Sequence, residues 1–335
     1  MKYSDTEFNG KIILITGGAG FIGSNLALYF QKNYPQSHVV VFDSFRSNSK
    51  FENGNLKSLG HFRNLIEFKG DVIYGNINNL NDLDLLNKYK FDFIFHQAAI
   101  SDTRVDDQEI VIKTNVNSFY NLLEIAKKNN SSLIYASSAS TYGNLPSPQK
   151  VGEENPDNTY GFSKLMMDQI AMKFIKKNPN MKIIGLRYFN VYGPNEYYKG
   201  NTSSMVIQLG LQILNGKKPK LFIDSSKYFR DFIYIDDVVQ ANIKAVNSTK
   251  SGVFNVGSGS PRSFKEIVDI LQNNLNTNFK IDYFENPFKN YQAHTQADLT
   301  DTKKCLKFFP EYNLESGIKA YISEIKLIHK NQQND

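Results

Sequence analysis

Residues 16–23 read Thr-Gly-Gly-Ala-Gly-Phe-Ile-Gly, and this stretch decides the fold. It follows a short apolar run at 11–16, typical of a buried parallel strand, and it precedes an amphipathic, helix-like stretch at 24–33. Glycines at 17, 20 and 23 allow a tight turn, close approach of the backbone to a pyrophosphate, and close packing of helix on strand. The helix N-terminus would offer free N–H groups to the phosphates. We interpret 16–23 as a dinucleotide-binding loop, with a glycine turn that binds no ligand as the alternative.

An acidic residue stands where such a loop needs one. Asp43 lies twenty residues beyond Gly23, at the end of the second apolar run. A carboxylate at this place usually accepts hydrogen bonds from the adenosine ribose and favours NAD. Arg46 and Lys50 follow, and they could neutralise the extra phosphate of NADP. The residues alone therefore leave the choice between the two cofactors open.

Strand-like and helix-like stretches alternate through the first half of the chain. Further apolar runs occupy 38–42, 91–95, 132–136 and 182–186, and amphipathic stretches occupy 82–89, 114–128 and 163–177. This order predicts an α/β fold, a Rossmann-type doubly wound parallel sheet, with a smaller, mixed C-terminal substrate-binding lobe. A return strand to the sheet is expected at 252–259. We expect a dinucleotide-binding domain at 1–189 and 230–257, the substrate-binding lobe at 190–229 and 258–330, and a flexible tail at 331–335.

Composition excludes several other classes of protein. The 335 residues carry a net charge of +6, but the lysines are scattered among acids rather than clustered, so we expect no nucleic-acid partner. No apolar run approaches the length of a membrane span, and the first ten residues lack a signal-peptide core. The single cysteine, Cys305, excludes an internal disulfide, and the five histidines show no metal-ligand spacing. We expect a cytoplasmic protein without a membrane or metal partner.

A second group of residues points to catalysis. Tyr160 and Lys164 are spaced i, i+4 at the start of a predicted helix, so both project from one face. A nearby ammonium would favour the tyrosinate, which is otherwise a poor base at neutral pH. Ser138 follows the apolar run at 132–136, where its hydroxyl could orient a substrate hydroxyl. A Tyr-x-x-x-Lys pair alone is more often a surface pair; together with the glycine loop and Ser138 it predicts proton transfer.

These motifs resemble those of the extended short-chain dehydrogenase/reductases. The likeness includes Arg-Tyr-Phe-Asn-Val-Tyr-Gly-Pro at 187–194 and Arg-Asp-Phe at 230–232, and it runs from about residue 11 to about residue 325. The resemblance implies an enzyme that acts on nucleotide-linked sugars as an epimerase, dehydratase or reductase. In the 4,6-dehydratases an acidic pair follows the active-site serine or threonine, whereas here Ala139, Ser140 and Thr141 follow Ser138. Dehydration is therefore not expected.

Three stretches in the second half resemble a narrower family, the ADP-L-glycero-D-manno-heptose 6-epimerases. They are Asn-Glu-Tyr-Tyr-Lys-Gly at 195–200, Lys-Leu-Phe at 220–222 and Tyr-Gln-Ala-His-Thr-Gln-Ala-Asp at 291–298. The resemblance implies transient oxidation at C6 of an ADP-linked heptose, in the supply of heptose for the inner core of lipopolysaccharide. It also implies NADP as cofactor, with NAD as the alternative, Lys199 as a second catalytic base, and a homo-oligomer, often a pentamer.

The same resemblance implies the remaining site residues. Besides Ser138, Tyr160, Lys164 and Lys199 as catalytic residues, those expected at the cofactor are Gly17, Gly20, Phe21, Ile22, Gly23, Asp43, Ser44, Lys50, Gln97, Ala98, Ala99, Ile100, Ser101, Asn115 and Val191, again with Tyr160 and Lys164. Those expected at the substrate are Ser138, Asn190, Lys199, Asn201, Gln208, Phe222, Ile223, Asp224, Ser225, Arg230 and Tyr291.

Some of these positions depart from the family or allow a second interpretation. Asn201 and Gln208 stand where the family often has a serine and a histidine, and the loop 46–68 is long for it, with Lys57 and His61 in no assigned role. Arg230 suits a diphosphate but could instead pair with Asp231 or Asp236. His96 is expected to be structural. The alternative functions are another nucleotide-sugar epimerase, oxidase or reductase, acting on GDP-heptose or UDP-hexose, and a cofactor-sensing protein that catalyses nothing.

Overall fold

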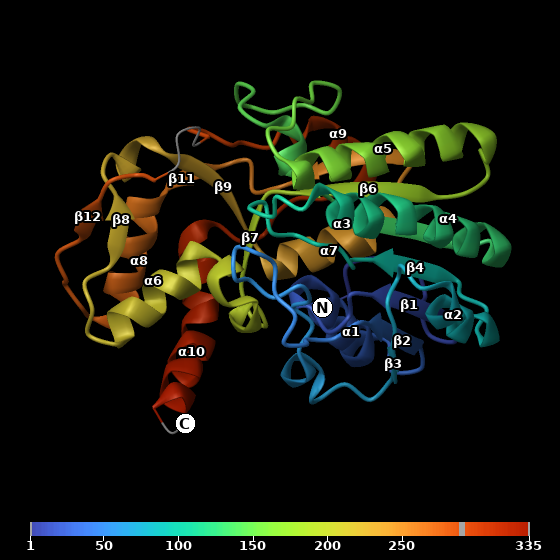
Figure 1. The fold of residues 1–335 in the computed structure, drawn as a ribbon, viewed down its shortest axis with the longest axis horizontal. Coiled ribbons are helices and arrows are strands. Elements are labelled where there is room, and N and C mark those ends of the chain that lie inside the picture. The colour runs from blue at the N-terminus through green and yellow to red at the C-terminus, as the bar shows by residue number, and fades with distance from the viewer. Residues whose placement is uncertain (1, 288–291, 334–335) are drawn as a thin grey trace.

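A computed structural model describes residues 2–287 and 292–333. Its central feature is a seven-stranded sheet in which all neighbouring strands are parallel, in the order β10-β6-β5-β4-β1-β2-β3 (Figure 1). The strands are β1 (Ile12–Thr16), β2 (His38–Asp43), β3 (Asp71–Tyr74), β4 (Phe93–His96), β5 (Ser132–Ser138), β6 (Ile183–Tyr188) and β10 (Gly252–Val256). This arrangement confirms the predicted doubly wound α/β fold.

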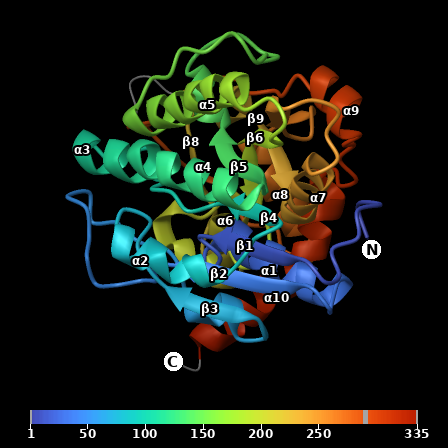
Figure 2. The same ribbon diagram turned by 90° about the vertical axis from the view of Figure 1, so that its right-hand side faces the viewer.

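Helices cover both faces of the sheet. Among the described residues they are α1 (Phe21–Asn33), α2 (Leu80–Asp84), α3 (Gln108–Val111), α4 (Ser118–Asn129), α5 (Thr159–Lys177), α7 (Ile235–Ala245) and α9 (Thr300–Leu306). The short helical turns between them are η1 (Phe62–Leu65), η2 (Leu85–Lys88), η3 (Ile112–Asn117) and η4 (Ala139–Tyr142). Helices α1 and α7 contact each other, and α4 and α5 lie together on the other side of the strands (Figure 2).

Alternate residues of one strand enter two different cores. In β1, Ile13 and Ile15 pack with α1 and α7, whereas Leu14 packs with α2, α4 and α5. Val39 and Val40 of β2 divide in the same way. Because both faces are buried, these strands need apolar residues at every position, which is why they could be recognised as continuous apolar runs.

The edge strand β3 lies outside the predicted strands. It ends the sheet, and its side chains alternate between partly buried and exposed, with Val72 47% and Tyr74 69% exposed. A strand buried on one face has no continuous apolar run, so the pattern that revealed the other strands is missing here.

The helix predicted at 114–128 is longer and interrupted. It starts with α3, passes through the π-helical turn η3 and continues as α4. Asn115 lies in the π turn, where its side chain bonds both the N–H and the C=O of Ile100 at 2.9 Å and reaches Ser163. Such turns are frequent at functional sites, because they redirect one side chain without ending the helix.

The remaining elements form a smaller lobe. Its strands are β7 (Asn190–Tyr192), β9 (Phe229–Tyr234) and β11 (Pro261–Ser263) in one sheet and β8 (Lys220–Phe222) with β12 (Asp282–Phe284) in another. The expected boundary at 230 is therefore too early, because β9 pairs with β7 and β11 of the lobe and not with the large sheet. Its helices are α6 (Met205–Leu214), α8 (Phe264–Leu275) and α10 (Leu314–Gln332), with the short turns η5 (Tyr197–Thr202) and η6 (Ser225–Lys227). Helices α6, α8 and α10 pack on one another at the end of the molecule away from β3 (Figure 1).

Two features of the helices bear on the sequence-based expectations. Helix α10 continues to Gln332, so it crosses the boundary at which a flexible tail was expected to begin. Among the residues that the structure describes, no helix is long and apolar enough to cross a membrane.

Candidate active site

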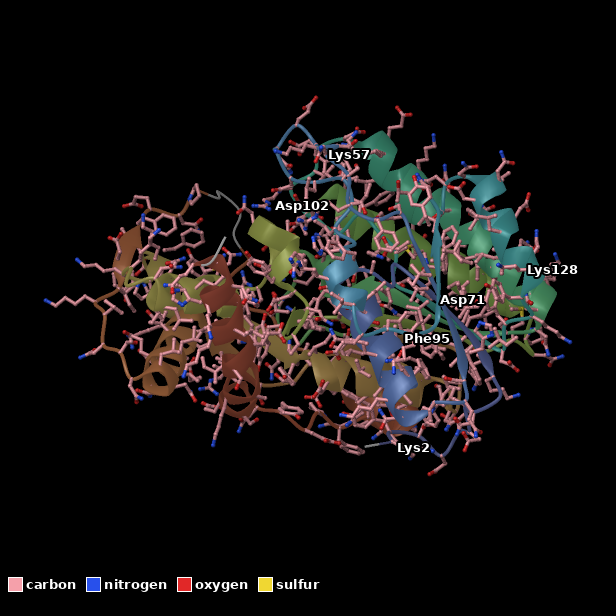
Figure 3. All side chains as sticks on the ribbon, turned by 90° about the horizontal axis from the view of Figure 1, so that it is seen from below. Lys2, Lys57, Asp71, Phe95, Asp102 and Lys128 are labelled. Atoms are coloured by element: carbon pink, nitrogen blue, oxygen red, sulfur yellow. The ribbon has the colours of Figure 1, made fainter. Side chains whose placement is uncertain are left out.

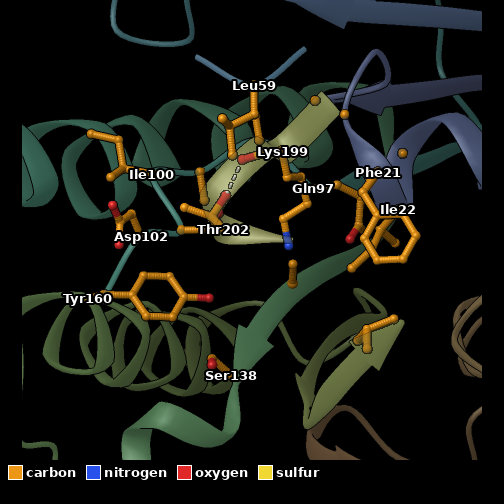
Figure 4. Close-up of a pocket in the computed structure, with 18 of the residues that line it drawn as sticks. Phe21, Ile22, Leu59, Gln97, Ile100, Asp102, Ser138, Tyr160, Lys199 and Thr202 are labelled. Carbon is orange, nitrogen blue, oxygen red and sulfur yellow. Dashed lines mark hydrogen bonds between the residues drawn. The ribbon is translucent and has the colours of Figure 1, made fainter. Parts of the chain in front are cut away.

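A cavity of about 540 Å³ lies where the carboxyl ends of β1, β2, β4 and β5 meet the smaller lobe (Figure 4). Glycine-loop residues, the turn after β4, Ser138 and the start of α5 form its wall on the sheet side. Lys199, Arg230 and Phe264 belong to its wall on the lobe side. The carboxyl edge of an open parallel sheet is the usual place for a ligand site.

The glycine loop is packed too closely for side chains. Gly17 has φ +69°, and a Cβ there would lie 2.6 Å from the backbone nitrogen of Ala98. A Cβ on Gly23 would lie 2.2 Å from the carbonyl oxygen of Gly17. Only glycine therefore lets β1, α1 and the turn after β4 approach one another, and the N-terminus of α1 faces the cavity as a phosphate site requires.

Asp43 is turned toward this loop. Its carboxylate accepts the N–H of Ala19 at 2.9 Å and the N–H of Phe45 at 2.8 Å, and only 6% of the residue is exposed. Burial raises the pKa of Asp43, and the bonds from the backbone N–H groups of Phe45, Ala19 and Gly20 oppose that rise. The carboxylate thus holds the glycine loop in place, while the residue still lines the cavity.

A loop from 44 to 61 covers the cavity beside Asp43. Its tip is docked on the turn after β4, where Asp102 accepts hydrogen bonds from Asn53 at 3.1 Å and Asn55 at 2.6 Å. Phe51 joins an apolar cluster with Ile100, Val105 and Val111. The covering loop brings Leu56, Lys57, Ser58, Leu59 and Gly60 to the cavity. Figure 3 shows Lys57 and Asp102 on the same side of the molecule.

The proposed proton-transfer residues enter from β5 and α5. Asn158 caps α5 by accepting the N–H of Gly161 at 2.9 Å, which fixes the first turn, on which Tyr160 lies. The ammonium of Lys164 donates to the carbonyl oxygen of Ala136 at 2.7 Å, and its nitrogen lies 5.8 Å from the centre of the Tyr160 ring. Ser138 ends β5 and lines the same cavity (Figure 4).

Burial governs the charge of this pair. It lowers the pKa of Lys164 to about 8, against the opposing effect of Asp168 one turn further along α5. It raises the pKa of Tyr160, and the Ser138 hydroxyl acts in the opposite direction. In the protein alone, therefore, the group that favours the tyrosinate is Ser138, whereas the sequence suggested Lys164.

A buried ionic cluster holds α5, the helix that carries Tyr160 and Lys164. Asp168 accepts hydrogen bonds from Tyr135 at 2.8 Å, Ser137 at 2.9 Å and Arg187 at 2.9 Å. Arg187, 2% exposed, also pairs with Glu154 at 2.6 Å. Since each charge is paired and hydrogen-bonded, the cluster fixes α5 against β5 and β6 without an uncompensated buried charge.

Lys199 reaches the cavity from the other lobe. It lies on η5, with its ammonium 5.5 Å from the centre of the Phe21 ring (Figure 4). Burial lowers the pKa of Lys199, and Glu196 raises it. Glu196 is fully buried and accepts the N–H of Gly193 at 3.1 Å and that of Ser204 at 2.6 Å, which ties together the two ends of this segment.

The structure brings together most of the residues expected at the cofactor. Of that set, Lys50 and Asn115 alone do not line the cavity; Lys50 lies on the exposed covering loop, and Asn115 lies beneath the turn after β4. Those that line it are Gly17, Gly20, Phe21, Ile22, Gly23, Asp43, Ser44, Gln97, Ala98, Ala99, Ile100, Ser101, Tyr160, Lys164 and Val191.

The expected substrate residues are more scattered. Ser138, Asn190, Lys199 and Arg230 line the cavity. The others that the structure describes do not: Asn201, Gln208, Phe222, Ile223, Asp224 and Ser225. Tyr291 lies outside the described residues.

Arg230 and its neighbour have separate partners. The guanidinium of Arg230 donates to the carbonyl oxygens of Phe229 and Gln292. Asp231 instead accepts bonds from Ser258 and from the backbone of Gly259 and Ala297, so its charge is satisfied by the β9 surroundings.

Fold and site together define a class of enzyme: a Rossmann-type protein with a glycine loop, a Ser–Tyr–Lys set and a second lysine contributed by the smaller lobe. Comparison with known proteins agrees. Residues 13–257 match the NAD dependent epimerase/dehydratase family, and the chain belongs to that family.

Two relatives place the chain more closely. It is 38% identical over 317 residues to the ADP-L-glycero-D-manno-heptose-6-epimerase of Brachyspira hyodysenteriae, a match that covers 92% of this chain and 96% of the relative. The crystal structure of Helicobacter pylori ADP-L-glycero-D-manno-heptose-6-epimerase has 51% identity and a TM-score of 0.88, over 97% of this chain and 99% of that one. The resemblance stated from the sequence is thus confirmed.

Two epimerases of other nucleotide-linked sugars share this fold at lower sequence identity. The UDP-glucose 4-epimerase of Thermotoga maritima, solved with UDP-glucose, is 27% identical with a TM-score of 0.84, over 95% of this chain and 99% of that one. The UDP-glucuronic acid 4-epimerase of Bacillus cereus, solved with UDP-glucuronic acid and NAD, is also 27% identical with a TM-score of 0.80, over the same shares.

His96 gives a prediction about stability. It is buried beneath the site, where Nδ1 lies 2.7 Å from the Thr16 hydroxyl, and burial together with the charge of Lys164 lowers its pKa to about 3. The folded state keeps His96 neutral where an unfolded chain would protonate it. Stability should therefore be complete above about pH 6.5 and fall toward acid by about 1.4 kcal/mol per pH unit from this group.

The measurement is urea unfolding of the wild type and His96→Asn at several pH values below about 6.5. The variant should lose this part of the pH dependence, whatever its stability at neutral pH. His294→Asn serves as control because His294 is exposed to water in the folded protein. Equal slopes for wild type and His96→Asn would contradict the assignment.

Proposed function

We propose that this protein interconverts ADP-D-glycero-β-D-manno-heptose and ADP-L-glycero-β-D-manno-heptose by transient oxidation at C6 with a bound NADP. The observation that carries the proposal is that Tyr160 from α5 and Lys199 from η5 line one cavity from two lobes. The names of the two relatives with the higher identities support the choice of substrate.

Two bases suit this reaction because inversion at an unactivated carbon needs a ketone. When bound, the nicotinamide supplies the acceptor and later the donor of the hydride. Inversion with a cofactor bound on one side would require the ketone to turn over before its reduction, and the ketone oxygen would then occupy a new place. One general base cannot reach both places, whereas Tyr160 and Lys199 can each serve one epimer.

The state of each group fits its role. Ser138 favours the tyrosinate and is available to orient the substrate hydroxyl beside Tyr160, while the Lys164 ammonium lies 5.8 Å from the centre of the Tyr160 ring. Because burial lowers the pKa of Lys199, more of it is neutral and able to accept a proton at neutral pH than of an exposed lysine. We assign the diphosphate to Arg230, which lines the lobe side of the cavity, because a guanidinium suits phosphate oxygens.

Other reactions of the family fit less well. Dehydration needs an acid after Ser138, but Ala139, Ser140 and Thr141 form η4 there. A UDP-hexose 4-epimerase is the second candidate, since a UDP-glucose 4-epimerase and a UDP-glucuronic acid 4-epimerase share the fold at 27% identity. A cofactor-sensing protein would have no chemical need of the Ser–Tyr–Lys set.

We extend the proposal to the setting of the reaction. The product would supply the heptose of the lipopolysaccharide inner core, the enzyme would act in the cytoplasm, and it would assemble as a homo-oligomer. The lipopolysaccharide role and the oligomer rest on the resemblance to the heptose epimerases, and the cytoplasmic location rests on the composition of the chain. The division into a dinucleotide-binding domain and a substrate-binding lobe is supported by the residues that each contributes to the cavity.

The cofactor is argued from the end of β2. The Asp43 carboxylate is used by the glycine loop, while Lys57 and the paired hydroxyls of Ser44 and Ser58, 3.2 Å apart, line the adjoining part of the cavity. Hydroxyls and an ammonium are the groups that suit a 2′-phosphate. We therefore assign the NADP-selecting charge to Lys57; Arg46 instead donates to the carbonyl oxygen of Tyr198, and Lys50 lies outside the cavity.

The reaction is tested by proton NMR of purified protein with ADP-D-glycero-D-manno-heptose and no added cofactor. The L-glycero epimer should appear without net release of reduced cofactor, and dinucleotide extracted from the protein should be NADP. Exclusive turnover of a UDP-hexose would overturn the heptose assignment, and absence of turnover with any nucleotide sugar would favour a sensor.

The two bases are tested by Tyr160→Phe and Lys199→Met. Each should lower turnover by about 100-fold or more, because loss of a general base costs about 10²–10⁴-fold. Cofactor affinity should change little, since only a proton-transfer group is removed. Turnover near that of the wild type in either variant would contradict the role of that residue.

Cofactor choice is tested by Lys57→Ala and Lys50→Ala in protein stripped of its dinucleotide. Lys57→Ala should weaken NADP binding about tenfold, about 1.4 kcal/mol, and leave NAD binding nearly unchanged. Lys50→Ala should affect neither. If Lys50→Ala weakened NADP binding and Lys57→Ala did not, Lys50 would be the residue that binds the 2′-phosphate. An equal loss of NADP and NAD binding in Lys57→Ala would show that Lys57 does not recognise the 2′-phosphate.

A further inference from the structure

The segment that carries Lys199 is joined to the covering loop by three residues. The ring of Tyr198 stacks on that of His61, with centroids 3.7 Å apart and 1° between the planes. Arg46 donates to the carbonyl oxygen of Tyr198, and its guanidinium carbon lies 5.9 Å from the centre of the same ring. We call Arg46, His61 and Tyr198 the Tyr198 clamp.

The cofactor-domain side of the clamp is fixed to the glycine loop. The N–H of His61 donates to the carbonyl oxygen of Ala19 at 2.9 Å, and Nδ1 of His61 accepts the N–H of Arg63 at 3.2 Å. The N–H of Arg46 donates to the carbonyl oxygen of Gly60 at 2.7 Å. A short chain of contacts therefore leads from the glycine loop to Tyr198, the residue next to Lys199.

The segment itself has little regular structure to hold Lys199. It is a short 3-10 turn, η5, in which Gly200 has non-helical angles, φ 57° and ψ −126°. The Glu196 carboxylate ties the ends of the segment together at Gly193 and Ser204, but the clamp acts in its middle. Lysine is a long, flexible side chain, so its reach depends on where the backbone of η5 is placed.

We propose that Tyr198, held by Arg46 and His61, is a positioning residue that places Lys199 for its half of the reaction. This rests on the proposed function, in which Tyr160 and Lys199 each serve one epimer. It also gives Arg46 and His61 a role that does not involve the cofactor phosphate. The clamp joins the two lobes at the point where a base from one must meet a cofactor held by the other.

The role predicts an asymmetric effect. A displacement of about 1 Å in a reacting group can cost about 100-fold in rate. Loss of the clamp should slow only the oxidation in which Lys199 takes the proton, since Tyr160 is held independently by α5 and its cap at Asn158. Overall turnover slows in both directions alike, because the equilibrium constant is fixed, so the asymmetry is visible only in single turnovers.

The experiment is stopped-flow absorbance of enzyme-bound reduced cofactor after mixing the NADP-loaded enzyme with each epimer separately. In Tyr198→Ala, formation of reduced cofactor should slow by about 10- to 100-fold from one epimer and stay unchanged from the other. Tyr198→Phe keeps the ring and should recover most of the rate. Tyr120→Ala, a change at an exposed tyrosine on α4, is the control for a general loss of aromatic surface.

Equal slowing from both epimers would show a merely structural role, and no slowing would show that the clamp positions nothing; either result overturns the inference. If the wild type itself does not oxidise either epimer, the proposed function fails, and the clamp is then judged by chemistry that needs no substrate.

A second measurement, which needs no substrate, is the rate at which acetic anhydride acetylates Lys199, followed by peptide mass spectrometry. Release of η5 should expose the amine and raise its labelling severalfold in Tyr198→Ala relative to the exposed Lys250, which serves as internal reference. His61→Ala should have the same effect because it removes the other half of the stack. Unchanged labelling of Lys199 in both variants would overturn the proposed positioning.

Discussion

The close approach of three backbones at the glycine loop is the constraint on which the rest of the structure depends. Gly17 touches the turn after β4, and Gly23 lies against the carbonyl of Gly17, at distances that exclude any side chain. This packing sets the start of α1 against the carboxyl edge of the sheet, which is where a pyrophosphate can meet free N–H groups. The carboxylate of Asp43, at the end of β2, accepts a hydrogen bond from the glycine loop. A residue at this position usually binds the ribose, and here it also stabilises the conformation of the loop. The other site residues lie around this loop.

The chemistry follows from where the elements end. Strand β5 stops at Ser138, α5 presents Tyr160 and Lys164 on one face, and the buried Asp168–Arg187 cluster holds that helix to the sheet. Burial shifts both proton-transfer groups in the direction that makes them less charged, as desolvation does for any ionisable group. A bound oxidised nicotinamide would add a positive charge, which favours the tyrosinate further.

Much of the sheet domain could be predicted because its information is local. Buried parallel strands are continuous apolar runs, and Tyr160 and Lys164 share a face through helical spacing alone. The rest depends on contacts between distant residues. The direction of the Asp43 carboxylate depends on its bonds to the backbone of Ala19 and Phe45. The presence of Lys57 rather than Lys50 at the cavity and the contact of Arg46 with Tyr198 depend on how the covering loop folds back. Periodicity carries no signal for such contacts, and the half-exposed β3 lacked even the apolar run.

A two-lobed design has a geometric consequence for epimerisation. On the proposed function, the cofactor domain would supply one base, Tyr160, and the ketone, once turned, would present its oxygen to a base from the smaller lobe, Lys199. The position of a base that belongs to another lobe depends on the contacts that join the two lobes. In this chain the connection runs from Ala19 through His61 to Tyr198, next to Lys199, and it uses the covering loop that also carries Lys57. On the proposed function, this loop would serve two tasks, one at the cofactor through Lys57 and one at the second base through the Tyr198 clamp.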